Sequence, residues 1–331
     1  MTTRYADFDL ASGDNDGTSW ANAWRTFAEI MSDATVVAGD TVLCRGTTTE
    51  ACVNTLSGDE TNGLIKWIGV DASGNNVGGT TRCIIDAATA NQVPLTQTGN
   101  YNLYENFAFC NSGNNAGVSG AGDDNVYVNC AIYDNNGAGY YGSGMSRVFF
   151  IRCVSYSNGG NGFSTNGGAV LIFCCSRDST GDGFTLTTYD RCIGCIAYDN
   201  GDTGFDNVYQ GLLFNCVSNL NTDDGVRLRS GATSYISAVI GCRITNHSGA
   251  GDIGLNANTE ICLYGWNYME NNADANVQNA TLAYALTLNG ATTNIEDQAN
   301  TNQGYTDDDP EDFNLRTDAS LRRNAITIPT S

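Results

Sequence analysis

The chain has 331 residues, of which 15 are Lys or Arg and 36 are Asp or Glu, so its formal net charge is −21 at pH 7. This charge repels phosphate backbones and anionic membrane surfaces, so we expect no nucleic acid and no membrane as partner. No apolar run is long enough to span a bilayer, and the N-terminus lacks the basic and apolar regions of a secretory signal. With 41% hydrophobic residues the chain can form a packed core.

Residues 1–38 are expected to form an N-terminal cap. Four large apolar residues there have the spacing of one helical face: Trp20, Trp24, Phe27 and Met31. We therefore predict an amphipathic helix whose apolar side closes one end of a repetitive domain.

A repeat with a period near 21 residues follows and is clearest from residue 110 onward. Its most regular member is a cysteine, found at Cys110, Cys130, Cys153, Cys174, Cys195, Cys216, Cys242 and Cys262. The segments between are short and rich in β-branched and aromatic residues, with Asn, Gly and Asp at their ends, which is typical of strands and turns. Three strands and three turns fit in one repeat, so we predict coils that stack at the ~4.8 Å spacing of paired strands.

Two further columns follow the cysteines. Five residues after them stand Asn115, Asn135, Asn158, Ser179, Asn200, Asn221 and His247, and ten residues after stand Tyr140, Phe163, Phe184, Phe205 and Val226. Stacked Asn side chains can bond one another along the solenoid axis, and the aromatic column can fill the interior by offset stacking. The cysteines are expected to point inward as unpaired thiols, which suits a reducing compartment. If any cysteines pair, the candidates are those outside the column, Cys44, Cys52 and Cys83.

These columns resemble the right-handed parallel β-helix of the pectate-lyase-like superfamily, with its Asn ladder and stacked aromatic residues. Segments 12–26, 38–42 and 312–321 resemble the opening and closing of superfamily members that are frequent in bacteriophage sequences. The resemblance implies an all-β chain: a single-stranded right-handed parallel β-helix over 39–270, with an N-terminal capping helix and an irregular C-terminal extension over 271–331. The superfamily includes lyases, hydrolases, epimerases, adhesins and virion parts, so the resemblance indicates fold more than function.

Carboxylates also recur in register. The equivalent pairs are Asp178 with Asp199, Asp202 with Asp223, and, two coils apart, Asp182 with Asp224. Register places such pairs about 5 or 10 Å apart, which overlaps the spacing of glycosidase carboxylates. Catalysis would use Asp182, Asp202, Asp223 and Asp224 with Arg227 as charge partner. A Ca²⁺ site would use Asp178, Asp199, Asp202 and Asp223. The alternative is that all of them are solvated turn residues.

A column of tyrosines stands three residues after the cysteines. Tyr133, Tyr156 and Tyr198 face outward if strand alternation continues from the inward cysteine. Such a strip is suited to stacking on sugar rings.

Two classes of function remain open. The first is a non-enzymatic virion component, namely a tail, tail-spike-like or head-decoration protein. It would fold in the host cytoplasm, form a homotrimer, contact other virion proteins and bind host-surface glycans. The second is an extracellular glycoside hydrolase or lyase that degrades polysaccharide through the carboxylates above. The sequence contains no complete catalytic motif, and calcium is the one cofactor it leaves open.

Overall fold

The computed structural model describes most of the solenoid. The described residues are 1–33, 35–76, 82–88, 92–113, 115–144, 147–228, 236–247, 253–256, 261–273, 275–278, 284–285, 287–288, 291–292 and 295–296. The closing segment at 312–321 and most of the predicted C-terminal extension lie outside these residues.

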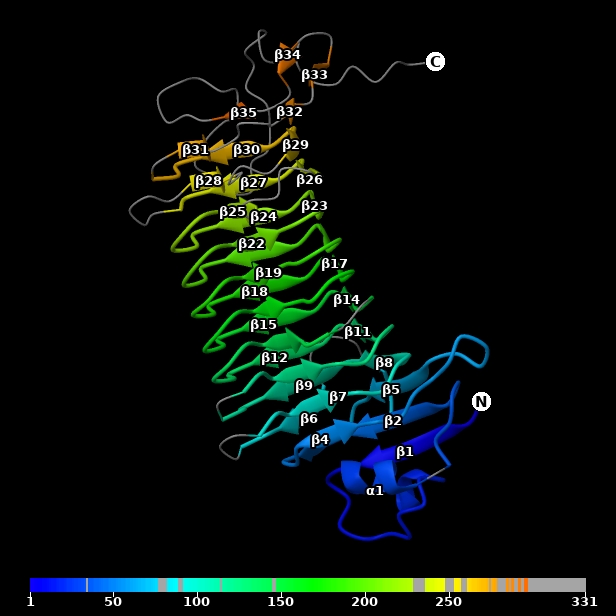
Figure 1. Cartoon of the computed structure of the whole chain (residues 1–331). Coiled ribbons are helices and arrows are strands. Elements are labelled where there is room, and N and C mark those ends of the chain that lie inside the picture. The colour runs from blue at the N-terminus through cyan, green and yellow to red at the C-terminus, as the bar shows by residue number, and fades with distance from the viewer. Residues whose placement is uncertain are drawn as a thin grey trace.

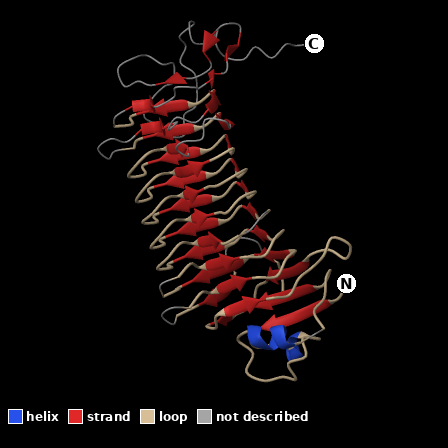
Figure 2. Ribbon diagram, viewed as in Figure 1, coloured by secondary structure: helices blue, strands red, loops and turns tan. Residues whose placement is uncertain are grey.

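The described chain is a parallel β-helix, in which each coil adds one strand to each of three long sheets (Figures 1 and 2). We name them sheet A with 12 strands, sheet B with 11 and sheet C with 10, visited by the chain in that order. Successive coils of the solenoid have about 23 residues on average. The predicted fold is confirmed, whereas the period of 21 holds only for the central coils. Phe163 pairs with Phe184 one coil later, but Tyr140 pairs with Phe163, 23 residues away.

The strands are short, as the sequence predicts. Sheet A consists of β1 (Thr3–Asp7), β2 (Thr41–Arg45), β5 (Ile65–Gly69), β8 (Asn102–Glu105), β11 (Val126–Val128), β14 (Phe149–Ile151), β17 (Val170–Ile172), β20 (Arg191–Ile193), β23 (Leu212–Phe214), β26 (Ile236–Ile240), β29 (Ile261–Gly265) and β32 (Tyr284–Ala285). Sheet B consists of β3 (Thr47–Thr48), β6 (Cys83–Asp86), β9 (Phe107–Cys110), β12 (Ala131–Tyr133), β15 (Val154–Tyr156), β18 (Cys175–Arg177), β21 (Ile196–Tyr198), β24 (Val217–Asn219), β27 (Arg243–Thr245), β30 (Tyr268–Glu270) and β35 (Ile295–Glu296). Sheet C consists of β4 (Cys52–Asn54), β7 (Leu95–Gln97), β10 (Val118–Gly120), β13 (Tyr140–Gly142), β16 (Phe163–Ser164), β19 (Phe184–Thr185), β22 (Phe205–Val208), β25 (Val226–Leu228), β28 (Ile253–Asn256) and β31 (Ala275–Gln278). A separate antiparallel pair joins β33 (Thr287–Leu288) to β34 (Ala291–Thr292).

The solenoid continues past residue 270. Strands β31, β32 and β35 pair in parallel with β28, β29 and β30 of the preceding coil. The sequence lost its repeat signal here because these strands keep the backbone pairing without the cysteine and glycine positions that marked the earlier coils.

The N-terminal segment forms two short helical pieces instead of one amphipathic helix. These are η1 (Trp20–Asn22), capped by Ser19, and α1 (Phe27–Ser32), which begins in a capping box between Thr26 and Glu29. Trp24 lies between them in extended backbone, where its N–H donates to the Tyr5 carbonyl at 3.1 Å and its carbonyl accepts from Asp7. These bonds to β1 interrupt the helix.

The two pieces nevertheless cover the first coil, as Figure 1 shows for α1. The Phe27 ring packs 5.5 Å from Trp67 of β5. Within the described residues no helix has the length and apolar composition needed to cross a membrane.

The interior contains the predicted columns. Tyr140, Phe163, Phe184 and Phe205 stand in register on sheet C, and the Phe184 and Phe205 rings stack at 4.8 Å with 6° between their planes. The cysteine column is buried, and the twelve cysteines whose side chains the structure describes are free. Cys44, Cys52 and Cys83 are among them, so no disulfide forms at these candidates.

The Asn ladder lies in the buried turn between sheets B and C. The side-chain oxygen of Asn221 accepts from the backbone N–H of Asn200 at 3.0 Å and from its side-chain amide at 2.8 Å. The Asn221 amide in turn donates to the Ala197 carbonyl at 3.2 Å. Ser179 and His247 are also buried at ladder positions. The ladder therefore satisfies backbone groups that would otherwise be buried without partners.

Three members of the predicted columns were wrong: the first and last cysteines and the first asparagine. Cys110 pairs with Tyr133, three positions away from the cysteine column, and Phe107 takes the column position instead. Ser112 bonds to the Asn135 side chain at 3.0 Å, while Asn115 is exposed. Cys262 pairs with Ser237 on sheet A and so lies outside the column too. The cysteine spacing of 20 residues at both ends of the column does not match the true strand register. The register is set by the pairing of the preceding strands, which the cysteine spacing alone does not show.

The substitution Asn221→Ala tests the ladder. It leaves two buried Asn200 donors without their acceptor, so we expect a loss of about 3 kcal/mol in the free energy of unfolding, measured by urea denaturation. Asn115→Ala is the matched control and should change it by less than about 0.5 kcal/mol. Equal effects of the two substitutions would contradict this assignment of the ladder.

Candidate functional site

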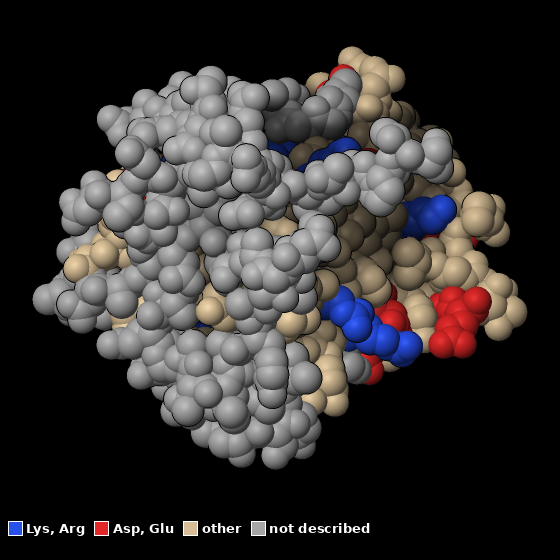
Figure 3. Space-filling view, turned by 90° about the horizontal axis from the view of Figure 1, so that it is seen from above, with Lys and Arg blue, Asp and Glu red and all other residues tan. Residues whose placement is uncertain are grey.

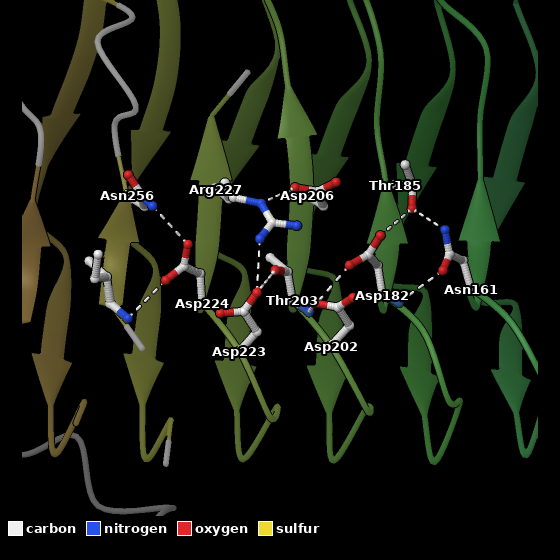
Figure 4. Close-up of polar contacts among 11 residues, drawn as sticks. Asn161, Asp182, Thr185, Asp202, Thr203, Asp206, Asp223, Asp224, Arg227 and Asn256 are labelled. Carbon is white, nitrogen blue, oxygen red and sulfur yellow. Dashed lines mark hydrogen bonds and ion pairs between the residues drawn. The ribbon is translucent and has the colours of Figure 1, made fainter. Parts of the chain in front are cut away.

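The candidate acids gather where the turns after sheet B enter sheet C (Figure 4). Asp182 and Asp224 each precede a glycine and the inward residue that begins β19 or β25. A Cβ at Gly204, the equivalent glycine of the coil between them, would lie 2.0 Å from the Ser218 hydroxyl and 2.6 Å from the Gly225 carbonyl. Glycine at this position lets neighbouring coils approach, and it places the preceding acid close to the next coil.

Asp182 and Asp224 bridge successive coils. Asp182 accepts the backbone N–H of Thr203 at 3.2 Å and the Thr185 hydroxyl at 2.9 Å. Asp224 accepts the backbone N–H of Ile253 and the Asn256 amide, both at 2.9 Å. Both carboxylates are buried. They act as a second polar ladder, parallel to the Asn ladder, and Asn161 begins it by accepting the Asp182 N–H at 3.0 Å.

Arg227 holds the outer part of the cluster together. Its Nε donates to Asp206 at 2.6 Å and its Nη1 donates to Asp223 at 2.8 Å. Although burial opposes its charge, the hydrogen bond and negative charge of Asp206 raise the pKa of Arg227 above its usual value. Figure 3, which looks down from the C-terminal end, also shows basic and acidic side chains close together on part of the described surface.

Burial affects the protonation of several acids. It raises the pKa of Asp182 to about 6, assisted by the negative charge of Asp206. Burial and a hydrogen bond with Asp223 raise the pKa of Asp202. Burial also raises the pKa of Asp224, against the opposing bonds from Asn256 and Ile253. The low exposure of these carboxylates and the repulsion between their charges therefore both oppose deprotonation of the cluster at neutral pH.

The structure thus brings Asp182, Asp202, Asp223, Asp224 and Arg227 into one cluster, as their register predicts. Asp206 belongs to it as well, although no register-equivalent acid in the sequence indicated it. A signal for it existed, because the position after the inward residue that begins the strand of sheet C is polar in four successive coils: Ser164, Thr185, Asp206 and Arg227.

Asp178 and Asp199 lie apart from this cluster, on the exposed turn after sheet B. The Asp178 N–H donates to the Asp199 carbonyl at 3.1 Å, and the Asp178 carboxylate pairs with Arg177. Within the described residues no group of three Cys, His, Asp or Glu side chains is arranged to hold a metal ion. Arg227 also places positive charge beside Asp223, which disfavours Ca²⁺ there. The calcium site stays a prediction.

The tyrosine column faces outward on sheet B. Tyr133 pairs with Tyr156, and Arg177 stands in register between Tyr156 and Tyr198, which is 39% exposed. The Tyr133 and Tyr156 rings stack at 4.9 Å, and the Arg177 guanidinium lies 4.8 Å from the centre of the Tyr156 ring. Both faces of Tyr156 are therefore occupied, and this column presents hydroxyls, ring edges and a guanidinium to solvent.

Comparison with known proteins identifies the fold. No protein-family model matches the chain, and no curated protein matches it in sequence. The pectate lyase Pel9A superposes with a TM-score of 0.69 at 18% identity, covering 86% of this chain and 79% of that one. An alginate lyase from Paenibacillus sp. str. FPU-7 gives 0.63 at 11% identity, covering 86% and 99%. ORF18 of Geobacillus virus E2 gives 0.52 at 16% identity, covering 82% and 60%. The chain is therefore a pectate-lyase-like right-handed parallel β-helix, a fold shared by polysaccharide lyases and a phage protein.

Asp182→Asn tests the electrostatics of the cluster. A carboxyl with a folded pKa of about 6 and an unfolded value of 3.8 binds its proton more tightly in the native state, so ionisation destabilises the fold. Stability due to this group is full below pH 4 and is lost as the pH rises to about 6. Asparagine keeps the acceptor for Thr203, so we expect the variant to be more stable by on the order of 2 kcal/mol at pH 7.5 and unchanged near pH 4.

The measurement is chemical denaturation at several pH values. Asp199→Asn, on the exposed turn, is the control and should change the free energy of unfolding by less than about 0.5 kcal/mol. A destabilised Asp182→Asn protein at pH 7.5 would show that the fold needs the ionised carboxylate.

Proposed function

We propose that this chain is a structural β-helix protein of a phage particle that binds host-surface glycans without cleaving them. The observation that carries the proposal is the use of the candidate catalytic carboxylates within the fold. Asp182 and Asp224 are buried acceptors for the backbone of the next coil, and Arg227 is neutralised by Asp206 and Asp223. These groups are therefore occupied by structural bonds.

The remaining pair of acids is also bound within the fold. The Asp223 N–H donates to the Asp202 carbonyl at 3.3 Å, and the Asp223 carboxylate accepts from Arg227 at 2.8 Å. A glycosidase needs two carboxyl groups that are free to act on the substrate, and Asp223 is already ion-paired. A lyase would need positive charge to neutralise a uronate, and the acidic surroundings of Arg227 repel such a substrate.

Two observations support the phage assignment. ORF18 of Geobacillus virus E2 shares the fold over 82% of this chain. The twelve free cysteines, nearly all buried, are suited to folding in a reducing compartment such as the host cytoplasm. With this assignment we propose a homotrimer that contacts other virion proteins.

Sheet B offers the glycan-binding surface in this proposal. Tyr198 is its most exposed tyrosine, and Arg177 beside it supplies hydrogen-bond donors. Because stacking closes the faces of Tyr156, we assign sugar contact to Tyr198 and Arg177 and only edge contact to Tyr133 and Tyr156.

The second candidate function is a polysaccharide-degrading enzyme, extracellular in location. The observation in its favour is the pKa of about 6 for Asp182, because a carboxyl protonated near neutral pH can act as a general acid. In that case Asp202, Asp223 and Asp224 would be its partners, with Arg227 as the charge partner.

Turnover and binding assays with the purified full chain separate the two functions. We expect no release of reducing ends or unsaturated products from pectate, alginate or host-surface polysaccharides. Product release that is lost in Asp202→Ala and Asp223→Ala proteins of unchanged assembly would establish the enzyme instead.

For binding, we expect Tyr198→Ala to weaken retention on host-surface polysaccharide by about tenfold or more, since a stacked aromatic contributes on the order of 1 kcal/mol beyond its buried area. Tyr141→Ala, which removes a 51% exposed tyrosine from sheet C, is the matched control and should bind normally. Equal retention of both variants would show that Tyr198 on sheet B does not contribute to polysaccharide binding.

A further inference from the structure

The outer face of sheet A is apolar over seven consecutive strands, from β8 to β26, which run up one side of the solenoid (Figure 1). Two outward columns cover it. The first consists of Leu103, Val126, Phe149, Val170, Arg191, Leu212 and Ala238, and the second of Glu105, Val128, Ile151, Ile172, Ile193, Phe214 and Ile240. All fourteen are at least partly exposed. We call these residues the sheet A patch.

This exposure contradicts the simplest interpretation of the sequence. Val128, Ile151, Ile172, Ile193 and Phe214 each stand two residues before an inward cysteine, so alternation would bury them. A single residue with positive φ separates each from its cysteine, for example Arg152 at 54° and Asn215 at 54°. That turn starts sheet B and resets the alternation. The fold therefore places this apolar column on the outer face of sheet A, where its side chains do not contribute to the core.

Large aromatic side chains add to the edge of the patch. Phe173 and Trp266 occupy the positive-φ turn between sheets A and B, both at φ 54°, and they are 59% and 43% exposed. Left-handed backbone is unfavourable for bulky residues, and Asn or Gly occupies the same turn in most other coils. The Phe173 ring lies over Gly194 of the next coil, where an added Cβ would be 2.5 Å from Phe173 Cδ1. An exposed aromatic residue in this conformation indicates a surface role.

The patch has the size of an interface core. Seven strands at ~4.8 Å spacing and three residues per strand give about 30 Å by about 15 Å with side chains, or on the order of 450 Å². A standard interface covers about 800 Å² on each partner, and somewhat more than half of that is apolar. The sheet A patch therefore supplies the apolar part, and the surrounding polar turn residues supply a rim.

The distribution of charge on the chain favours a second copy of the same chain as the partner. The two columns contain one acid, Glu105, and one base, Arg191, so the patch is close to neutral on a chain of net charge −21. The acidic cluster of Asp202, Asp206 and Asp223 lies on the sheet C side. Two copies of so acidic a chain repel each other least when they meet through this face.

We infer that copies of this chain associate with one another through the sheet A patch. The inference deepens the proposed self-association by naming its surface, and it does not depend on glycan binding or on the phage assignment. Burial of the two mainly apolar columns against a second copy removes a contiguous apolar face from water, and a patch of this size on a protein surface is often functional.

Light scattering on the full chain over a range of concentrations tests the inference. We expect the mass of two or more 35.1 kDa chains. Ile193→Asp places a charge in the centre of the patch and should raise the concentration for half-assembly by at least about 30-fold, as at an interface hot spot. Far-ultraviolet circular dichroism should show the same fold, because residue 193 points outward.

Ile196→Asp is the matched control. Ile196 lies three residues later in the same coil, on sheet B, and is 41% exposed, so its substitution should leave assembly unchanged. A monomeric wild-type chain, an Ile193→Asp protein that assembles normally, or equal dissociation of both variants would each overturn the inference. A monomer that Ile193→Asp destabilises would show that the chain's own segments cover the patch, which also overturns it. Glycan assays address the proposed function separately.

Discussion

The in-register stacking of parallel strands is the constraint on which this structure depends. Each coil hydrogen-bonds to the next at the ~4.8 Å strand spacing, so every side chain meets its own equivalent above and below. Phe184 against Phe205 is favourable in this arrangement, and so is Asn200 against Asn221. Identical charges stacked in this way repel each other and are unfavourable. The composition follows from this rule, because the interior repeats aromatic, Cys and Asn residues and leaves charges to turns and outer faces.

The acidic cluster shows how the same stack accommodates carboxylates. Asp182 and Asp224 are separated by Thr203 in the intervening coil, so these two acids are not direct neighbours in their column, whereas Asp202 and Asp223 are neighbours in theirs. Each accepts a backbone N–H from the next coil, and Arg227 joins Asp206 to Asp223 on the outside. A group of acids that looks catalytic from its spacing is thus largely explained by the need to bond one coil to the next. The raised pKa of Asp182 reflects burial in that structural role.

Each of the three sheets presents a different kind of side chain on its outer face. Sheet C carries the acidic cluster, sheet B carries the Tyr and Arg column, and sheet A carries the apolar patch. Polysaccharide lyases and a phage protein share this fold, which is consistent with function residing in the outward columns. Those columns are free to vary because they do not fill the core.

The sequence by itself determined the repeat, the fold class and the inward columns, because side chains that must stack on their equivalents recur at a readable period. It also identified five of the clustered residues, since register brings Asp182, Asp202, Asp223, Asp224 and Arg227 together. Only the tertiary structure decided the register of the first and last coils, the break at Trp24 and the membership of Asp206. It alone placed Ile172 and Ile193 outside, because a single positive-φ residue reverses strand alternation and leaves no mark in the hydrophobic pattern.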